Sequence, residues 1–248
     1  MPDGTQLRVH RGNLVLDTPG ATYDSMDIHG LVTITAPNVT IRRSIIRGGV
    51  VNGSTGLVTN IDPTATNFVI EDSTLVPSTP SVFLDGLKGG NYTARRLDIS
   101  GVVDGAKVHG NNVSISGTWI HGMRWFSSDP YQGGTGTHND GIQVLGGANV
   151  SIVGNDISGA SGAAIQVTQD YSDVRNMLIQ GNFLGGGGCS LNVAEKGGPA
   201  LQQFRLLNNR FERTSTFNCP AIIARGTTFE NRDNTWRDNG VAIPIQRN

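Results

Sequence analysis

Hydrophobic and polar residues alternate along this chain in short runs that recur at a nearly constant interval. Most runs begin at an Asn, continue through four or five alternating positions and end in a small turn. The clearest copies are NVTIRRSIIRG from Asn38, NFVIEDSTLV from Asn67, NYTARRLDISG from Asn91, NVSISGTWIHG from Asn112, NVSIVGNDISG from Asn149 and NMLIQGNFLGG from Asn176. Weaker copies begin at Ala21, Gln203 and Thr228. A period of two is typical of a short β-strand with one buried face.

The apolar residues of the repeats form two stripes, which predict the hydrophobic core. The first stripe follows the anchor, as in Val39 and Ile41 or Val150 and Ile152. The second lies eight residues after the anchor and runs Ile46, Leu75, Ile99, Ile120, Ile157, Leu184, Phe211 and Trp236. No segment of useful length has the helical period. Short strands that stack at an interval near 25 residues predict an all-β fold, a single-domain right-handed parallel β-helix of about eight to nine coils over residues 1–248.

Two sets of polar residues fall in register between repeats, and we interpret both as structural. The sixth position after the anchor holds Asn155, Asn182, Asn209 and Asn234, which predicts a ladder of side-chain amides between neighbouring coils. Arg42-Arg43, Glu71-Asp72 and Arg95-Arg96 alternate in sign on successive repeats, as cross-strand pairing prefers.

Composition and charge exclude several classes of protein. Glycine contributes 34 of 248 residues, without the period of collagen, and the formal net charge is −1. Without a basic excess, sustained nucleic-acid binding is not expected. No apolar stretch approaches the roughly 18 residues that a membrane span needs, so no membrane partner is expected either. An isolated β-helix of this size is expected to be a monomer.

The two cysteines, Cys189 and Cys219, occupy the same position of two consecutive repeats, in GCSLNVAE and NCPAIIAR. Facing positions on neighbouring strands permit a disulfide, and the alternative is a pair of buried free thiols. A disulfide would imply an exported, extracellular protein. Met1 is followed at once by polar sequence rather than by a signal peptide, so we expect this chain to be a mature form.

A third strand precedes each anchor and presents a polar stripe. It reads DGAKVHG, DGIQVLG, AAIQVTQ and SLNVAEK, which places Lys107, Gln143, Gln166 and Asn192 outward, with His109 two places after Lys107. A row of long polar side chains on a parallel sheet suits a polymer that lies along the solenoid axis. The alternative is an ordinary solvated sheet face.

One interval between anchors is 37 residues, about 12 more than its neighbours, and marks an inserted loop at about 121–138. Loops of this length are commonly functional. Folded over the polar stripe, it would form a cleft with an aromatic platform for sugar rings; the alternative is an Ω-loop that packs on the sheet edge. The chemistry-bearing residues of this segment are His121, Arg124, Trp125, Phe126, Asp129, Tyr131, His138 and Asp140.

Asp104 and Asp140 occupy the same Asp-Gly turn on consecutive coils. Stacked carboxylates repel each other, so they are expected to bind Ca²⁺ with Asp129 or backbone carbonyls, or to keep one proton as a general acid. A pair of carboxylates on neighbouring strands, about 5 Å apart, also suits a retaining glycosidase. The alternative is that both cap turns. His109, His121 and His138 lack the fixed spacing of a zinc site, although they are candidates to converge near Asp140.

The stacked repeats and THNDGIQ (137–143) resemble secreted right-handed β-helix proteins of the pectate-lyase-like superfamily, and NNRFE followed by NTWRDNGVAI resembles an actinobacterial group of them. In lyases of this class an Arg or Lys takes the C5 proton of a uronate while a cation neutralises its carboxylate. The resemblance implies that Lys107 is the base and that Arg124 or His138 is the neutraliser or acid. The chain lacks the WIDH-type motif of pectate lyases and the complete NTDG…DD…GHG…RIK series of polygalacturonases, which argues against pectin.

Three functional hypotheses follow. The first is an extracellular polysaccharide lyase that cleaves a uronate-containing polymer by β-elimination. The second is a glycoside hydrolase that uses Asp104 and Asp140. The third is a non-catalytic carbohydrate-binding or adhesion protein. In each, a polysaccharide is the partner, held by Gln143, Gln166 and Asn192 together with His109, His121, Trp125 and Tyr131.

Overall fold

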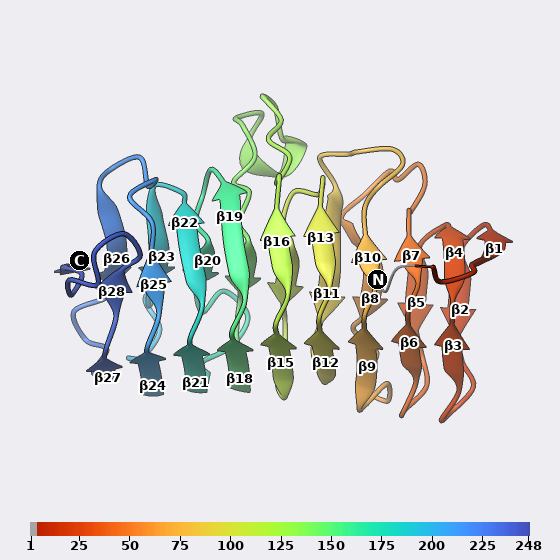
Figure 1. The fold of residues 1–248 in the computed structure, drawn as a ribbon, viewed down its shortest axis with the longest axis horizontal. Coiled ribbons are helices and arrows are strands. Elements are labelled where there is room, and N and C mark those ends of the chain that lie inside the picture. The colour runs from red at the N-terminus through yellow and green to blue at the C-terminus, as the bar shows by residue number, and fades with distance from the viewer. Residues whose placement is uncertain (1–3) are drawn as a thin grey trace.

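The alternating runs form three parallel β-sheets that stack coil upon coil into a right-handed β-helix (Figure 1). The structure is a computed structural model, and it describes residues 4–248. The sheets, here called A, B and C, contain ten, ten and nine strands. Strands β1 (Arg8–Arg11), β2 (Leu14–Leu16) and β29 (Ile245–Arg247) lie outside the sequence repeats, so the predicted eight to nine coils do not include them. Among residues 4–248, no helix has the length and apolar character that a membrane crossing requires.

Each coil contributes one strand to each sheet, in the order A, B, C, except that the last coil described has no strand in sheet C. Sheet A contains β1 (Arg8–Arg11), β4 (Met26–His29), β7 (Ile45–Ile46), β10 (Thr74–Leu75), β13 (Asp98–Ser100), β16 (Trp119–His121), β19 (Asp156–Ala160), β22 (Phe183–Gly186), β25 (Arg210–Phe211) and β28 (Thr235–Trp236). Sheet B contains β2 (Leu14–Leu16), β5 (Val32–Ile34), β8 (Thr55–Asn60), β11 (Leu84–Gly89), β14 (Ala106–Val108), β17 (Ile142–Val144), β20 (Ile165–Val167), β23 (Cys189–Val193), β26 (Cys219–Ile223) and β29 (Ile245–Arg247). Sheet C contains β3 (Thr22–Asp24), β6 (Thr40–Arg42), β9 (Phe68–Glu71), β12 (Tyr92–Arg95), β15 (Val113–Ser116), β18 (Gly147–Val153), β21 (Val174–Gln180), β24 (Gln202–Leu207) and β27 (Phe229–Arg232).

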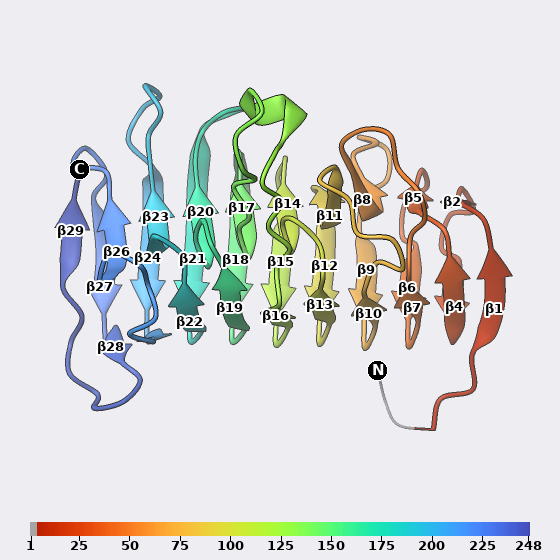
Figure 2. The same cartoon turned by 90° about the horizontal axis from the view of Figure 1, so that it is seen from above.

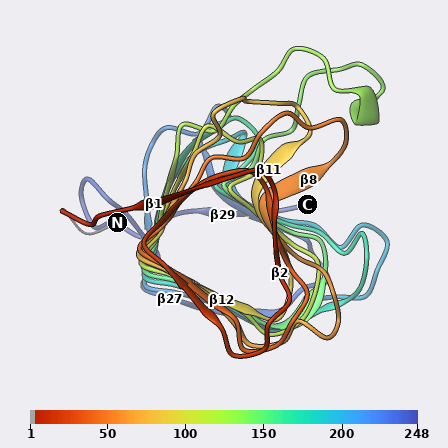
Figure 3. The same cartoon turned by 90° about the vertical axis from the view of Figure 1, so that its right-hand side faces the viewer.

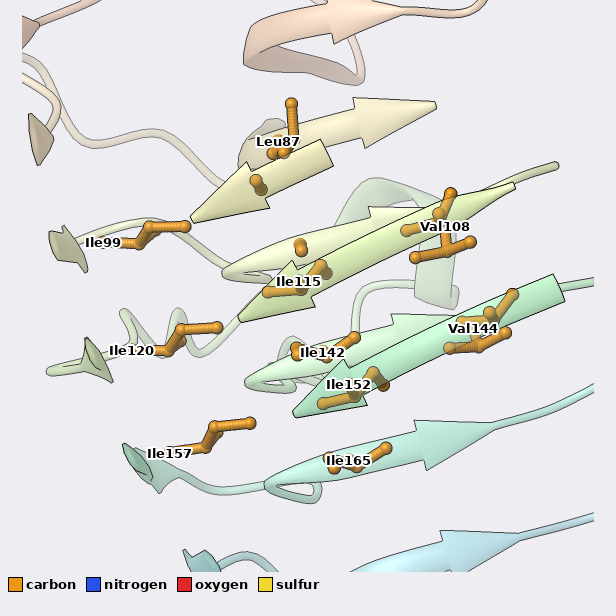
Figure 4. Packing of buried hydrophobic residues seen from close by; sticks show 14 of the residues in the cluster. Leu87, Ile99, Val108, Ile115, Ile120, Ile142, Val144, Ile152, Ile157 and Ile165 are labelled. Carbon is orange, nitrogen blue, oxygen red and sulfur yellow. The ribbon is translucent and has the colours of Figure 1, made fainter. Parts of the chain in front are cut away.

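The inward residues of the three sheets fill the interior of the solenoid. Ile99, Ile120 and Ile157 stack on one another along sheet A, facing Val108 and Val144 of sheet B (Figure 4). These five side chains are at most 1% exposed, and both predicted stripes are buried along their whole length. The hydrophobic pattern therefore identified the core correctly.

Asparagine ladders hold the coils in register, inside and outside. Inside, the Nδ2 groups of Asn155, Asn182 and Asn209 each donate to the Oδ1 of the next residue in the ladder at 2.9 Å, ending at Asn234. This ladder confirms the prediction. The anchor asparagines form a second ladder at the surface, and all have left-handed backbone φ of 49° to 61°. Asn recurs there because it tolerates this conformation better than most residues.

The predicted charge alternation forms ion pairs at one of its two steps, between Glu71-Asp72 and Arg95-Arg96. Arg95 Nε lies 2.6 Å from Glu71, and Arg96 Nε lies 2.7 Å from Asp72. Arg42 stands beside Glu71 in the sheet register but pairs with Asp24 on the preceding coil instead, at 2.9 Å. The sequence alignment did not include Asp24 as a partner.

The Cys189–Cys219 disulfide forms as predicted. The two residues are register partners on β23 and β26, with a Cα–Cα distance of 4.6 Å. Neither cysteine is free. Such a disulfide is compatible with an extracellular protein, since it persists in oxidising compartments.

The insertion lies at the corner between sheets A and B, where β16 ends and β17 begins. We call residues 122–141 the long loop; it carries the only helix within residues 4–248, the 3₁₀ helix η1 (Pro130–Gln132). Viewed along the solenoid, the long loop projects from one corner of the coil, beside β8 and β11 (Figure 3). Viewed from above, it rises over the strands of sheet B, which run in order from β2 to β29 (Figure 2). The long loop thus borders the outer face of sheet B.

Candidate active site

A groove of about 880 Å³ follows the outer face of sheet B. A smaller cavity of about 320 Å³ adjoins it near β11, and the two share part of their lining, including Lys107 and His138. We call the larger space the groove and the smaller one the side cavity. The long loop forms one wall through Gln132 and His138, and the loop after β20 forms the opposite wall through Tyr171. A polymer along the solenoid axis would follow this groove.

The floor of the groove is the polar stripe that the sequence predicts. Lys107, Gln143, Gln166 and Asn192 are successive register partners, and each is half-buried and lines the groove. Their neighbour Lys88, one strand earlier, extends the stripe. The side-chain Oδ1 of Asn192 is buried and has no hydrogen-bond partner within residues 4–248, which leaves an acceptor for a sugar hydroxyl.

Three Asp-Gly pairs stack where β11, β14 and β17 begin. Their glycines permit a close approach between coils: a Cβ on Gly105 would lie 2.5 Å from the carbonyl oxygen of Gly141, and one on Gly86 would lie 2.3 Å from that of Gly105. No side chain fits there, so glycine is required. This packing stacks the aspartates beside them, Asp85, Asp104 and Asp140.

Asp104 lies at the centre of this stack, and both of its side-chain oxygens have partners within the protein. Its Oδ1 accepts the backbone N–H of Asp140 at 2.8 Å, and its Oδ2 lies 2.7 Å from the Lys107 ammonium. Its side chain is 1% exposed. Asp104 therefore positions Asp140 and Lys107.

Lys107 is held in its protonated form. Burial by itself lowers the pKa of Lys107, but the carboxylates of Asp104 and Asp85 outweigh burial and raise the pKa above its usual value. The Lys107 Nζ lies 3.3 Å from Asp85 Oδ2 as well. A lysine with a raised pKa is a poor general base at neutral pH, which argues against the role of base that the resemblance implies for Lys107.

Asp140 and Asp85 also have raised pKa values, but for a carboxyl group a raised pKa favours the neutral, protonated form rather than the charged one. Burial raises the pKa of Asp140 well above its usual value, and the neighbouring Asp104 adds to this rise. Asp140 lines the groove and accepts the backbone N–H of Ala163 at 2.7 Å through Oδ1. Burial likewise raises the pKa of Asp85, which lines the side cavity, to about 6. Carboxyl groups perturbed in this way recur at catalytic sites.

Besides Asp140, the long loop brings three of its predicted residues to the site. His138 lines both the groove and the side cavity, next to Lys107. Asp129 accepts the backbone N–H of Tyr131 at 2.8 Å and so caps η1. This cap orders the tip of the loop, where Tyr131 lines the side cavity and packs edge-on against Phe83.

Other predicted residues lie away from the groove. His121 belongs to sheet A, where it stacks on Trp119 and binds Asp98 at 3.0 Å. Arg124 is exposed and lies 6.0 Å from the Phe126 ring centroid. The three histidines therefore do not converge, because His121 lies on the outer face of sheet A and the groove lies on sheet B.

Two further residues lie at the edge of the site. Trp125 is 54% exposed and packs over Gly136 within the long loop, so it lines neither the groove nor the side cavity. His109 packs against Tyr171, with 5.1 Å between ring centroids, and lies behind the groove wall. Burial, together with Lys88 and Lys107, lowers the pKa of His109 to about 4, so it is neutral at neutral pH.

The carboxylates predicted to bind Ca²⁺ do not fit a calcium site. Within residues 4–248, no three or more His, Cys, Asp or Glu side chains gather to hold a metal ion. Both oxygens of Asp104 have partners within the protein, and Asp129 caps η1.

Sequence reasoning missed Asp85, Lys88, Tyr171 and Phe217. A signal for the first two exists, since DGLK (85–88), DGAK (104–107) and DGIQ (140–143) are copies of one motif. Tyr171 and Phe217 line the groove and are 65% and 74% exposed. Exposed aromatic rings beside polar floor residues are suited to stacking against sugars. Both rings lie on loops whose place over the groove depends on the coil geometry.

No protein-family model matches this chain, and no curated protein matches it. Among solved structures, the chain is similar to the A-module of the mannuronan C-5 epimerase AlgE6 of Azotobacter vinelandii, with a TM-score of 0.51 and 13% identity. The match covers 93% of this chain and 65% of the epimerase chain, so this chain spans less than two thirds of that length. The likeness shows the fold alone.

A second similar structure is the catalytic domain of a GH87 α-1,3-glucanase. Its TM-score is 0.34 at 12% identity, with 95% of this chain and 53% of that chain covered. This likeness is too distant to bear on function.

Proposed function

We propose that this protein is an extracellular glycoside hydrolase that cleaves a neutral polysaccharide bound along the groove. The observation that carries the proposal is a buried carboxyl group, Asp140, whose pKa is raised and which lines a groove that extends from Lys88 on β11 to Ile222 on β26. A carboxyl group whose pKa is raised by burial is what protonation of a glycosidic oxygen requires. One structural neighbour is a mannuronan C-5 epimerase, which supports a polysaccharide as the class of substrate.

The charge of the groove favours a neutral substrate. Its lining and that of the side cavity include three lysines, Lys88, Lys107 and Lys196, and five aspartates, Asp85, Asp104, Asp129, Asp140 and Asp170. The ammonium of Lys107 is already paired with two of these carboxylates. Without an excess of positive charge, the groove would not attract a polymer that carries a carboxylate on every sugar.

We assign Asp140 as the general acid and Asp85 as the general base that activates water. The two aspartates lie two strands apart, because Asp104 stands between them. Strands are spaced about 4.8 Å apart, which separates Asp85 and Asp140 by roughly 9–10 Å. Inverting glycosidases separate their carboxyl groups by about 6.5–9.5 Å to leave room for a water molecule. The spacing therefore favours inversion over the retaining mechanism expected for Asp104 and Asp140.

Lys107 has an electrostatic role in this proposal. Its ammonium lies between Asp104 and Asp85 and favours the ionised form of Asp85, which is the form that accepts a proton from water. Gln143, Gln166 and Asn192 would bind sugar hydroxyls along the floor, and Tyr171 and Phe217 would stack on sugar rings.

A lyase that acts on a uronate-containing polymer is the second candidate. It is favoured by one observation: Lys107 and His138 line the same groove. In that reaction the roles expected from the sequence would exchange, with the fixed charge of Lys107 neutralising the uronate carboxylate and His138 removing the C5 proton. The exchange follows from the raised pKa of Lys107.

The test is a screen of neutral glucans, xylans and mannans beside alginate, pectate and glycosaminoglycans. We expect new reducing ends from a neutral polymer without the ultraviolet absorbance of an unsaturated uronate. That absorbance with a uronate polymer would instead establish the lyase, and binding without cleavage would establish the non-catalytic protein.

The Asp140→Asn variant tests the assigned acid. We expect its kcat to fall roughly 100- to 10,000-fold, the usual contribution of a general acid. Asp156→Asn is the matched control, because Asp156 lies on sheet A, away from the groove. Full activity of Asp140→Asn would refute the assignment.

A further inference from the structure

The groove is closed at the end where the catalytic aspartates lie. On the floor, the Lys88 ammonium lies 2.7 Å from the Ser54 hydroxyl, which belongs to the segment leading into β8. The next outward residue along the sheet, Thr59, is only 9% exposed and lines neither the groove nor the side cavity. The floor therefore ends at Lys88.

The tip of the long loop closes the same end from above. Tyr131 packs edge-on against Phe83, with 5.5 Å between ring centroids. Its hydroxyl also lies 3.8 Å from the point where a Cβ on Gly53 would stand. Viewed along the solenoid, the segments that lead into β8 and β11 project on the same side of the coil as the long loop (Figure 3). Three segments that are distant in sequence thus meet as an end wall.

The opposite end of the groove has a different form. Its lining continues past Gln166 and Asn192 to Ile222 and Asn248, at the last two strands of sheet B. Between the end wall and those strands, the flanking ring of Phe217 is 74% exposed. Asp85 and Asp140 lie within two strands of the wall, whereas the binding surface extends in one direction only.

From this asymmetry we infer that the enzyme acts on chain ends. The inference rests on the proposed function and adds the cleavage mode to it. The terminal sugar enters the side cavity beneath Tyr131, and the rest of the polymer follows the floor over Gln143, Gln166 and Asn192. An internal stretch of polymer cannot take this position, because the chain would have to continue through Tyr131, Phe83 and Ser54. Hydrolysis then adds water across the glycosidic bond, and the short terminal product leaves the side cavity.

The product pattern on the neutral polymer identified by the screen tests this inference. We expect short products of one size from the first minutes, with viscosity falling slowly. Polymer labelled at one end should release its label early when that end is the one cleaved. Long oligosaccharides of many sizes with a rapid loss of viscosity would overturn the inference and leave the hydrolase proposal intact.

The Tyr131→Ala variant tests whether the wall sets the mode. Tyr131 is 66% exposed at the loop tip, so the fold should tolerate its loss. We expect longer oligosaccharides among the products and a faster fall in viscosity for each bond cleaved. Trp125→Ala is the matched control, since Trp125 lies on the same loop but outside the groove, and its products should equal those of the unmodified protein.

Two other outcomes are informative. An unchanged product pattern in a Tyr131→Ala, Phe83→Ala double variant that remains folded by circular dichroism would overturn the wall as the determinant. A screen in which no glycan is cleaved would overturn the proposed function itself, and the inference with it.

Discussion

A carboxyl group that is buried beside other carboxyl groups ionises with difficulty, and at the residue scale this fact defines the site. Asp140 and Asp85 differ in what stands near them: the backbone N–H of Ala163 binds Asp140, whereas two ammonium groups lie near Asp85. Burial raises both pKa values, and the lysines limit the rise at Asp85 to a pKa of about 6. One type of residue thereby supplies both an acid and a base.

The pH dependence of activity follows from these pKa values. Asp85 must be ionised to accept a proton, so kcat/KM should fall as the pH drops below about 6. Asp140 must be protonated, so activity should also fall once the pH exceeds its raised pKa. The groups interact, so each limb reports on the cluster. A profile without an acidic limb near this pH would contradict the assignment of Asp85.

The Lys88→Met variant tests the same assignment independently. The Lys88 ammonium lies 3.7 Å from Asp85 Oδ2 and lowers the pKa of that carboxyl. Its removal should therefore move the acidic limb of kcat/KM to higher pH. The control is Arg175→Met, a loss of a positive charge at an exposed residue of sheet C. An acidic limb that stays in place would show that another group controls it.

At the scale of the element, the strands owe their position to ladders that repeat from coil to coil. The Asn182 side chain donates to Asn209 Oδ1 and to the carbonyl of Ile152, and it accepts from Asn155. It is fully buried, so none of these partners can bind water in its place. The surface ladder at Asn149 forms similar bonds in solvent.

The Asn182→Ala variant should therefore be destabilised by about 2–4 kcal/mol, since it leaves buried donors and acceptors without partners. Asn149→Gly, which keeps the left-handed backbone, should cost only about 0.5 kcal/mol. Urea unfolding followed by circular dichroism measures both free energies. Equal losses for the two variants would contradict the role given to burial.

At the scale of the whole molecule, a solenoid offers a continuous face along its axis, and the groove of this protein uses one such face. Its end near β11 is closed by loops, and towards its other end the groove passes over the two strands that the disulfide joins. Because each coil touches only its neighbours, a covalent link between two coils stabilises that end of the stack.

Loss of the Cys189–Cys219 disulfide should lower the free energy of unfolding by about 3–4 kcal/mol, as expected for a closed loop of about 30 residues. The measurement is urea unfolding of the Cys189→Ala, Cys219→Ala double variant against the oxidised protein. Reductant should lower the stability of the unmodified protein and leave the double variant unchanged. Equal stability of the two proteins would contradict the prediction.

The alternation of residues was enough to predict the β-helix, its core, the amide ladder, the disulfide and the stripe from Lys107 to Asn192. Each of these depends on position within a repeat, and the strand period and coil register convert position directly into location. The insertion at 121–138 could likewise be recognised, because it interrupts the period.

Other features depend on contacts between coils, and the residues of a single repeat do not predict these contacts. His121 and Arg124 lie near Asp140 in sequence but face away from the groove, because the corner between sheets A and B turns the chain. The raised pKa values of Lys107 and Asp140 arise from burial and from charges on neighbouring coils. The end wall joins Ser54, Phe83 and Tyr131, and only the three-dimensional fold brings these residues together.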